Sequence, residues 1–172
     1  MQCIMNLLRE KQWRGIRMEN TLAVAKTLYD SYLSKFNEPM DEMKMHKLMY
    51  FTQRESLICT KEPLFDEEFH GWKYGPVLLS VREEYKRGAS FNDSNAGISV
   101  DSQKIVKQAF DRYAHMSAWK LSTLSHGELA WKVSRKGLKT GENGNIPLKL
   151  SAMRIDALRE SSERARSGSQ AE

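Results

Sequence analysis

Apolar residues recur at spacings of three and four positions along most of this 172-residue chain, and this feature constrains its fold the most. The first run follows Asn20 or Thr21, either of which suits an N-cap, and would line one helix face with Leu22, Ala25, Leu28, Tyr29, Tyr32, Leu33 and Phe36. A second run, over 41–60, is apolar around so much of its circumference that it predicts a central helix. Five more helices are expected, over 76–87, from Asp101 to Met116, just after Ser117, over 125–137 and after Pro147.

The segment between the second and third expected helices carries turn signals instead of helical spacing. Residues 62–66 are typical of a turn, and residues 67–74 of an extended stretch. Gly75 and Pro76 break the pattern, and Pro76 suits the first turn of the next helix because the N–H of that position is not needed there. We therefore predict a mainly α protein, a single compact domain of six to seven helices with at most a small β-hairpin near 64–75.

Ser125 and Glu128 have the spacing of a capping box, in which each side chain accepts a hydrogen bond from the other's backbone N–H. The box predicts that a helix starts at Ser125 and runs past Trp131 to Gly137. His126 lies inside this box and would need a nucleophile and an orienting carboxylate within hydrogen-bond reach to act as a catalytic base. Because the box already uses Ser125 and Glu128, a structural role is favoured over a hydrolase site.

The basic charge of the chain is unevenly distributed. The formal net charge is +5, yet residues 1–17 alone contain four basic side chains against one acidic side chain, and residues 151–172 are balanced. We expect an N-terminal extension over 1–17, with Met18 as an alternative start, a helical domain over 18–160 and a polar, disordered tail over 161–172. Nucleic-acid binders concentrate basic charge on the folded surface that binds, so this distribution disfavours that class.

Several other classes of protein are disfavoured by patterns that the sequence lacks. No stretch approaches the roughly 18 apolar residues of a membrane span, and the N-terminus lacks the pattern of a signal peptide, so we expect a cytoplasmic protein. There is no glycine-rich phosphate loop and no nucleophile elbow. The two cysteines lack CxxC spacing, and His46, His70 and His126 lack the spacing of metal ligands. We expect neither an enzyme nor a bound metal or cofactor.

Three blocks of sequence, in this order and spacing, resemble the Panacea family of SocA-like, phage- and plasmid-associated antitoxins. The first block is MKMHKLMYFTQ over 43–53, and the second is PLFDEE over 63–68 running into GWKYGPV over 71–77. The third is LSTLSHGE over 121–128 followed by Trp131. The resemblance covers roughly residues 20–160, and the second block is the most specific of the three.

The resemblance implies a function in protein binding. Antitoxins of this family neutralise a toxin protein that is usually encoded by the adjacent gene, so a cognate toxin is the expected partner. The position of the motifs makes Lys47, Tyr50, Trp72, Lys73 and Tyr74 the candidate contact residues. A structural role is expected for the remaining motif residues, which are Gly75, Pro76, Ser125, His126, Glu128 and Trp131.

Two alternatives stay open at this stage. The basic extension and the helical fold would also suit a DNA-binding regulator that acts on the operator of its own operon. Trp72, Lys73 and Tyr74 have a purely structural explanation as well, in which Trp72 fills a core position while Gly75 and Pro76 turn the chain.

Overall fold

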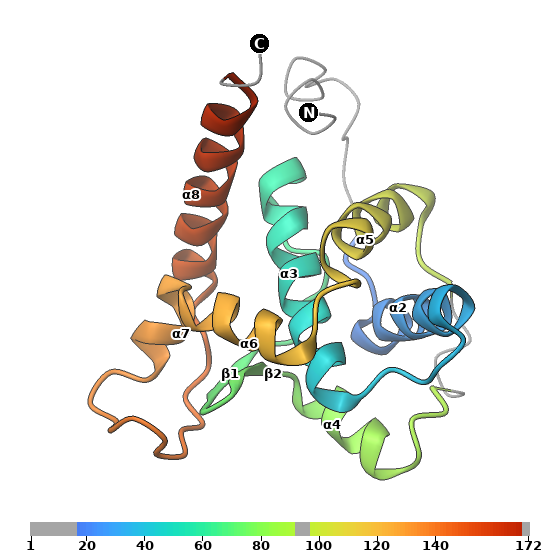
Figure 1. Cartoon of the computed structure of the whole chain (residues 1–172), viewed down its shortest axis with the longest axis horizontal. Coiled ribbons are helices and arrows are strands. Elements are labelled where there is room, and N and C mark those ends of the chain that lie inside the picture. Colours follow the sequence, from blue (N-terminus) through green and yellow to red (C-terminus); the bar gives the residue numbers. More distant parts are fainter. Residues whose placement is uncertain (1–16, 92–96, 170–172) are drawn as a thin grey trace.

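The computed structural model describes residues 17–91 and 97–169, and within these ranges the protein is mainly helical, as predicted (Figure 1). Seven helices occur there, α2 Thr21–Phe36, α3 Glu42–Thr60, α4 Leu79–Lys86, α5 Val100–Tyr113, α6 Ala118–His126, α7 Leu129–Ser134 and α8 Leu150–Ser169. A single hairpin, β1 His70–Trp72 and β2 Gly75–Val77, lies between α3 and α4. The N-terminal extension expected over 1–17 lies outside the described residues except for Arg17.

Helix α3 is the centre of the bundle, as its apolar circumference predicted. It packs against α2, α5, α6, α8 and the strand β2, and Figure 1 shows it between these elements. Its core side chains are fully buried over consecutive positions from Met45 to Phe51. Asp41 caps its first turn by accepting a hydrogen bond from the Lys44 N–H at 2.8 Å. All residues of α3 from Lys44 to Ile58 are buried, polar side chains included.

The hairpin extends two residues further than predicted, and Pro76 does not start a helix. Pro76 lies in β2 opposite Gly71, and α4 begins only at Leu79. The Gly71 N–H bonds away from the hairpin, to the Ile146 carbonyl at 2.9 Å. Gly71 and Pro76 are therefore a non-hydrogen-bonded pair of the hairpin, and the missing N–H of Pro76 removes no hydrogen bond between the strands. The prediction of a helix over 76–87 was wrong at its start for this reason.

The capping box predicted at Ser125 and Glu128 does not form. Ser125 lies in the last turn of α6 and donates to the Ser122 carbonyl at 2.8 Å, and Glu128 makes no side-chain cap. The N-terminus of α7 is capped by Asp156 of α8, which accepts from the N–H groups of Leu129 and Ala130 at 2.7 and 2.9 Å. A buried carboxylate from a distant helix replaces the local cap, so the predicted helix over 125–137 is divided into α6 and α7.

Helix α8 continues to Ser169, whereas we expected disorder from residue 161. Arg164 holds this last part of the helix by a bidentate contact with Glu55 of α3, at 2.9 and 2.8 Å. Residues 170–172 lie outside the described part of the chain. No helix within the described ranges is long and apolar enough to cross a membrane.

Candidate functional site

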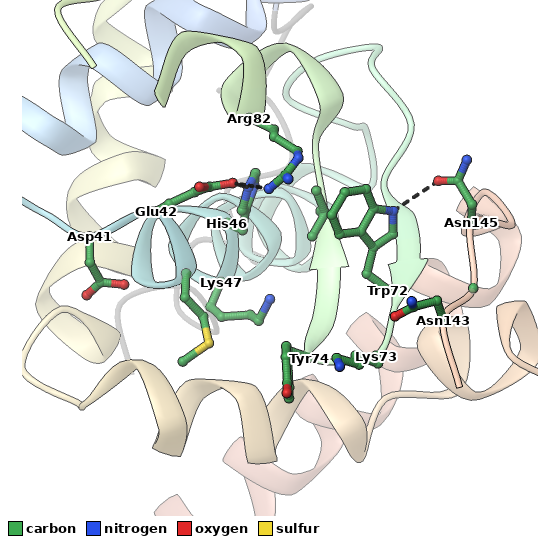
Figure 2. A pocket seen from close by; sticks show the side chains of 13 residues that line it. Asp41, Glu42, His46, Lys47, Trp72, Lys73, Tyr74, Arg82, Asn143 and Asn145 are labelled. Carbon is green, nitrogen blue, oxygen red and sulfur yellow. Dashed lines mark hydrogen bonds and ion pairs between the residues drawn. The ribbon is translucent and has the colours of Figure 1, made fainter. Parts of the chain in front are cut away.

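A pocket of about 820 Å³ opens where the start of α3, the hairpin, the start of α4 and the 143–145 loop meet (Figure 2). Its lining consists of Asp41, Glu42, Met43, His46, Lys47, Trp72, Lys73, Tyr74, Val77, Arg82, Asn143, Gly144 and Asn145. Four of the five candidate contact residues, Lys47, Trp72, Lys73 and Tyr74, are in this list. Lys47 and Trp72, which lie 25 positions apart in the sequence, thus meet at one site.

Tyr50, the fifth candidate contact residue, lies outside this pocket. Its side chain has no exposed surface, and its hydroxyl donates to Glu128 at 3.3 Å. The helical spacing placed Tyr50 on the same helix as Lys47, but it could not show that other elements of the bundle bury α3 at Tyr50. We therefore treat Tyr50 as a core residue and not as a contact residue.

Trp72 forms one wall of the pocket, and contacts with its indole N–H and with its ring hold it in place. Its indole N–H donates to the Asn145 side-chain oxygen at 3.0 Å, and the Arg82 guanidinium lies 4.8 Å from its ring centroid. Its carbonyl accepts from the Trp131 indole N–H at 2.9 Å. These contacts order the aromatic wall before any partner arrives.

The rim of the pocket carries an exposed aromatic pair. Tyr74 is 49% exposed and meets Trp119 of α6, itself 64% exposed, edge to face with ring centroids 5.7 Å apart. The Lys73 ammonium lies 4.7 Å from the Tyr74 ring centroid, within the range of a cation–π contact. Trp119 belongs to the short helix expected just after Ser117, for which the sequence indicated no function, and its large exposed area and its contact with Tyr74 now make it part of this surface.

Lys47 extends from α3 into the pocket, although only 1% of its surface is exposed. Its ammonium donates to the Pro76 carbonyl at 3.1 Å. Burial lowers the pKa of Lys47 to about 7, against the opposing influence of Asp41 and Glu42.

Gly75 has to be glycine because it lies directly above Lys47. Its φ of +111° is a left-handed conformation, and a Cβ at this position would come within 2.6 Å of the Lys47 side chain and within 2.6 Å of the Ser125 hydroxyl. Gly75 and Pro76 thus have a structural role, as expected. They allow β2 to approach α3 closely enough for the Pro76 carbonyl to accept a hydrogen bond from the Lys47 ammonium.

The acidic side of the pocket is already paired internally. Glu42 accepts from Arg82 at 3.0 Å and contacts the His46 ring at 3.3 Å, and these partners, His46 first, lower the pKa of Glu42. His46 receives the Leu78 N–H on its other ring nitrogen, and burial lowers the pKa of His46. His46 is therefore a neutral ring that joins α3 to the hairpin and is not poised as a catalytic base.

His126 and Trp131 form a stacked pair beside the pocket, with ring centroids 4.1 Å apart. The Ser125 hydroxyl is buried and donates to a backbone carbonyl, so it does not serve His126 as a nucleophile. Burial lowers the pKa of His126. In the described part of the chain, no group of three or more His, Cys, Asp and Glu side chains could hold a metal ion.

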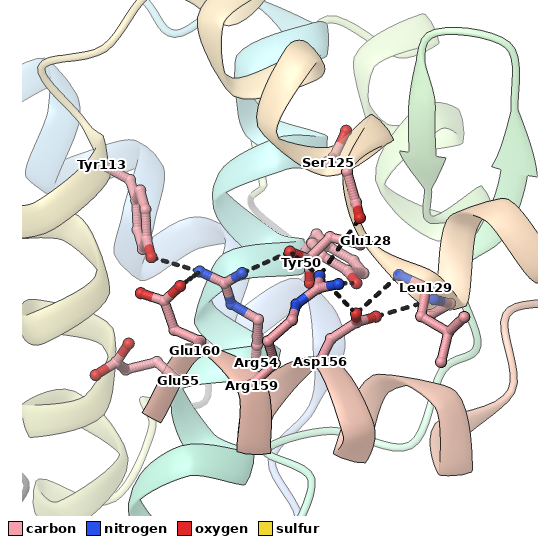
Figure 3. Close-up of polar contacts among 12 residues, drawn as sticks. Tyr50, Arg54, Glu55, Tyr113, Ser125, Glu128, Leu129, Asp156, Arg159 and Glu160 are labelled. Carbon is pink, nitrogen blue, oxygen red and sulfur yellow. Dashed lines mark hydrogen bonds and ion pairs between the residues drawn. The ribbon is translucent and has the colours of Figure 1, made fainter. Parts of the chain in front are cut away.

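A buried polar network lies further along α3, beyond the pocket (Figure 3). Arg54 donates to Glu128 at 2.7 Å and to the Tyr113 hydroxyl at 2.6 Å, while Asp156 caps α7 beside them. Burial raises the pKa of Glu128, and Arg54 opposes this rise. Sequence reasoning missed Arg54 and Asp156. One sequence signal could have indicated them, because each is a charged residue on a helix whose other residues predict a core face.

Comparison with known proteins places the chain in a family. The family model described as antitoxin SocA-like, Panacea domain matches residues 45–132, which include most of α3, the hairpin, α4, α5, α6 and Trp131. No curated protein and no solved structure gives a significant match. Because the family model covers more than half of the chain and contains Lys47, Trp72, Lys73 and Tyr74, the protein belongs to the SocA-like Panacea domain family of antitoxins.

Proposed function

We propose that this protein is a cytoplasmic antitoxin that neutralises a cognate toxin protein by direct contact, and that the toxin contacts the pocket and its rim. The observation that carries the proposal is the exposed aromatic and cationic surface formed by Trp72, Lys73, Tyr74 and Trp119. Trp and Tyr side chains are enriched in binding hot spots, and exposed aromatic patches commonly mark interaction sites.

The pocket is better suited to binding than to catalysis. Two of its ionisable side chains, Glu42 and Arg82, pair with each other, and the His46 ring accepts a hydrogen bond from the Leu78 N–H. Its aromatic wall is fixed by hydrogen bonds from Trp72 and Trp131. A rigid wall with paired charges favours recognition of a partner surface, because little side-chain entropy is lost on binding.

The proposal is tested by growth rescue in bacteria. The gene adjacent to this protein's gene is induced alone and together with this protein, as the parent chain or as the Trp72→Ala, Lys73→Ala double variant. We expect the parent to restore growth and the double variant to restore it poorly, since it lacks two side chains of the contact surface.

Two matched variants serve as controls. Lys107→Ala and Leu158→Ala remove exposed side chains of α5 and α8, which do not line the pocket, and both should rescue growth like the parent. Circular dichroism of all purified variants shows that each one is folded. Full rescue by a folded Trp72→Ala, Lys73→Ala variant would mean that the toxin binds elsewhere.

A further inference from the structure

Lys47 is the one lining cation of the described pocket that forms neither an ion pair nor a cation–π contact. Arg82 pairs with Glu42 and covers Trp72, and Lys73 lies over Tyr74. Lys47 has a hydrogen bond to the Pro76 carbonyl alone among the contacts of the described residues, although an ammonium can donate three. A buried ammonium with so few acceptors is costly, and an anion beside it would repay that cost.

The charge of the lining indicates how much negative charge the pocket can accept. Three basic side chains, Lys47, Lys73 and Arg82, stand against the two acidic side chains Asp41 and Glu42, and His46 is neutral. With Lys47 protonated, a single excess positive charge remains. One carboxylate would neutralise it, whereas a phosphate group with nearly two charges would face Asp41 and Glu42 uncompensated.

The rest of the lining fits an apolar group attached to that carboxylate. Trp72, Tyr74, Met43 and Val77 offer aromatic and aliphatic surface within the same 820 Å³ cavity. Asn143 and Asn145 border the pocket with amide groups that can bind a peptide backbone. A charged group at the base, an apolar wall and amides at the edge are the elements of a peptide-binding pocket.

We propose that this pocket binds a carboxylate-bearing apolar peptide segment, with the carboxylate on the Lys47 ammonium and the apolar side chain against Trp72 and Tyr74. The segment belongs to the toxin, and in this respect the inference rests on the proposed function. The carboxylate is supplied either by the C-terminal residue of the toxin or by an Asp or Glu side chain beside an aromatic residue. Both sources offer the same chemistry to Lys47.

The test is an NMR titration of the full chain with short peptides, slightly below neutral pH so that Lys47 is protonated. The probes are acetyl-Gly-Leu-Phe with a free carboxylate, the same peptide as its C-terminal amide, and acetyl-Phe-Asp-amide. The resonances followed are the Trp72 indole N–H and the Lys47 side-chain amine. We expect a carboxylate probe to shift both resonances and to raise the pKa of Lys47, and the amide peptide to shift neither.

The two carboxylate probes distinguish the sources. Stronger binding of acetyl-Gly-Leu-Phe assigns the site to a chain terminus, and stronger binding of acetyl-Phe-Asp-amide assigns it to an acidic side chain. The groups that face Lys47 and could titrate or respond in the same experiment are Asp41, Glu42, His46, Lys73, Tyr74, Arg82 and His126. Because the Lys47 resonance is followed directly, the titration of Lys47 is distinguished from the titration of these neighbouring groups.

Lys47→Met is the decisive variant, and Lys107→Met, at an exposed position of α5 outside the pocket, is its control. Replacing a buried amine by an apolar side chain of similar length should preserve the fold. We expect Lys47→Met to weaken binding of the carboxylate probe about tenfold or more, because a charge-assisted hydrogen bond is lost. Lys107→Met should bind the carboxylate probe like the parent, because its side chain is exposed and lies outside the pocket.

Three results would overturn the inference: no shift with any probe, equal binding of acid and amide, or equal affinity in Lys47→Met. Tighter binding of inorganic phosphate than of either carboxylate would also overturn it. The growth-rescue assay separates this inference from the proposed function. If folded Lys47→Met neutralises the toxin like the parent, the pocket proposal fails and the antitoxin role stands. If the parent neutralises no neighbour yet binds the acid probe through Lys47, the antitoxin role fails and the pocket chemistry stands.

Discussion

At the scale of single residues, Lys47 combines two properties that rarely occur together. It is almost fully buried, and it lines the pocket between α3, the hairpin and α4. Among the described residues, its ammonium donates a hydrogen bond only to the Pro76 carbonyl, at 3.1 Å. Its charge therefore costs stability in the free protein and is available to a partner.

The pH dependence of stability follows from this burial. The pKa of Lys47 is about 7 in the folded protein and about 10.4 in an unfolded chain, so the unfolded state binds more protons between these values. Folding stability contributed by this group thus rises with pH across that window. Between pH 7 and pH 9 we expect the free energy of unfolding to rise about 2 kcal/mol more in the parent than in Lys47→Met. Urea unfolding at several pH values measures this difference, and parallel curves would contradict it.

Asp156 is a second residue whose role depends on a distant element. It is the only acceptor found for the first two N–H groups of α7 in the described chain, and it also pairs with Arg159 at 3.0 Å. We expect Asp156→Ala to lower the free energy of unfolding by about 2 kcal/mol, since it removes a cap and leaves buried donors unsatisfied. Asp111→Ala, which removes an exposed carboxylate from α5, should cost less than about 0.5 kcal/mol. Equal losses in chemical denaturation would show that Asp156 does not cap α7.

At the scale of elements, the hairpin positions the candidate site. Lys73 and Tyr74 lie in its turn, and Trp72 lies in its first strand. The Pro76 carbonyl of its second strand accepts a hydrogen bond from Lys47. This arrangement requires the close approach of β2 to α3 at Gly75.

Substitution of Gly75 tests that approach. Gly75→Ala places a methyl group 2.6 Å from the Lys47 side chain at a positive φ, and we expect a loss of roughly 3 kcal/mol in the free energy of unfolding. Gly88→Ala is the matched control, since Gly88 has a similar φ of +103° and no neighbour within 4 Å. It should cost about 1 kcal/mol. If both substitutions cost the same in thermal or urea unfolding, β2 does not press against Lys47.

Local patterns predicted the helices well but not every boundary. Local patterns indicated each of the seven described helices, and two N-caps are residues of the expected type, namely Asn20, one of the two candidates for the first helix, and Ser117. Pro76 and Ser125 were misread because their local signals, a helix start and a capping box, are each overridden by a tertiary contact. Pro76 faces a strand position that needs no N–H, and α7 is capped from α8.

The candidate site was predictable only in part, for a similar reason. Motif position pointed to Lys47, Trp72, Lys73 and Tyr74, but spacing on a helix could not show that Tyr50 turns toward Glu128. Trp119 and the 143–145 loop have no local signal, because their role comes from lying beside the hairpin in space.

At the scale of the whole molecule, α8 closes the bundle over α3 by charge pairs as well as apolar packing. Arg164 reaches Glu55 at 2.8 Å and Glu160 at 2.8 Å. We expect removal of residues 161–172 to lower the free energy of unfolding by roughly 2 kcal/mol, with Arg164→Ala accounting for most of the loss. Arg166→Ala, an exposed neighbour, should change it by less than about 0.5 kcal/mol. Unchanged stability of the truncated chain would mean that residues 161–169 add nothing to the fold.

The central claim is that this protein neutralises a toxin by touching it through the pocket and its rim. The most direct test is the affinity of the purified protein for the purified product of the adjacent gene, measured by isothermal titration calorimetry. The account predicts a stable complex with the parent and an affinity at least about tenfold lower for folded Trp72→Ala, Lys73→Ala, as loss of hot-spot residues implies. A toxin that is neutralised in cells but shows no binding, or binds both proteins equally, would contradict it.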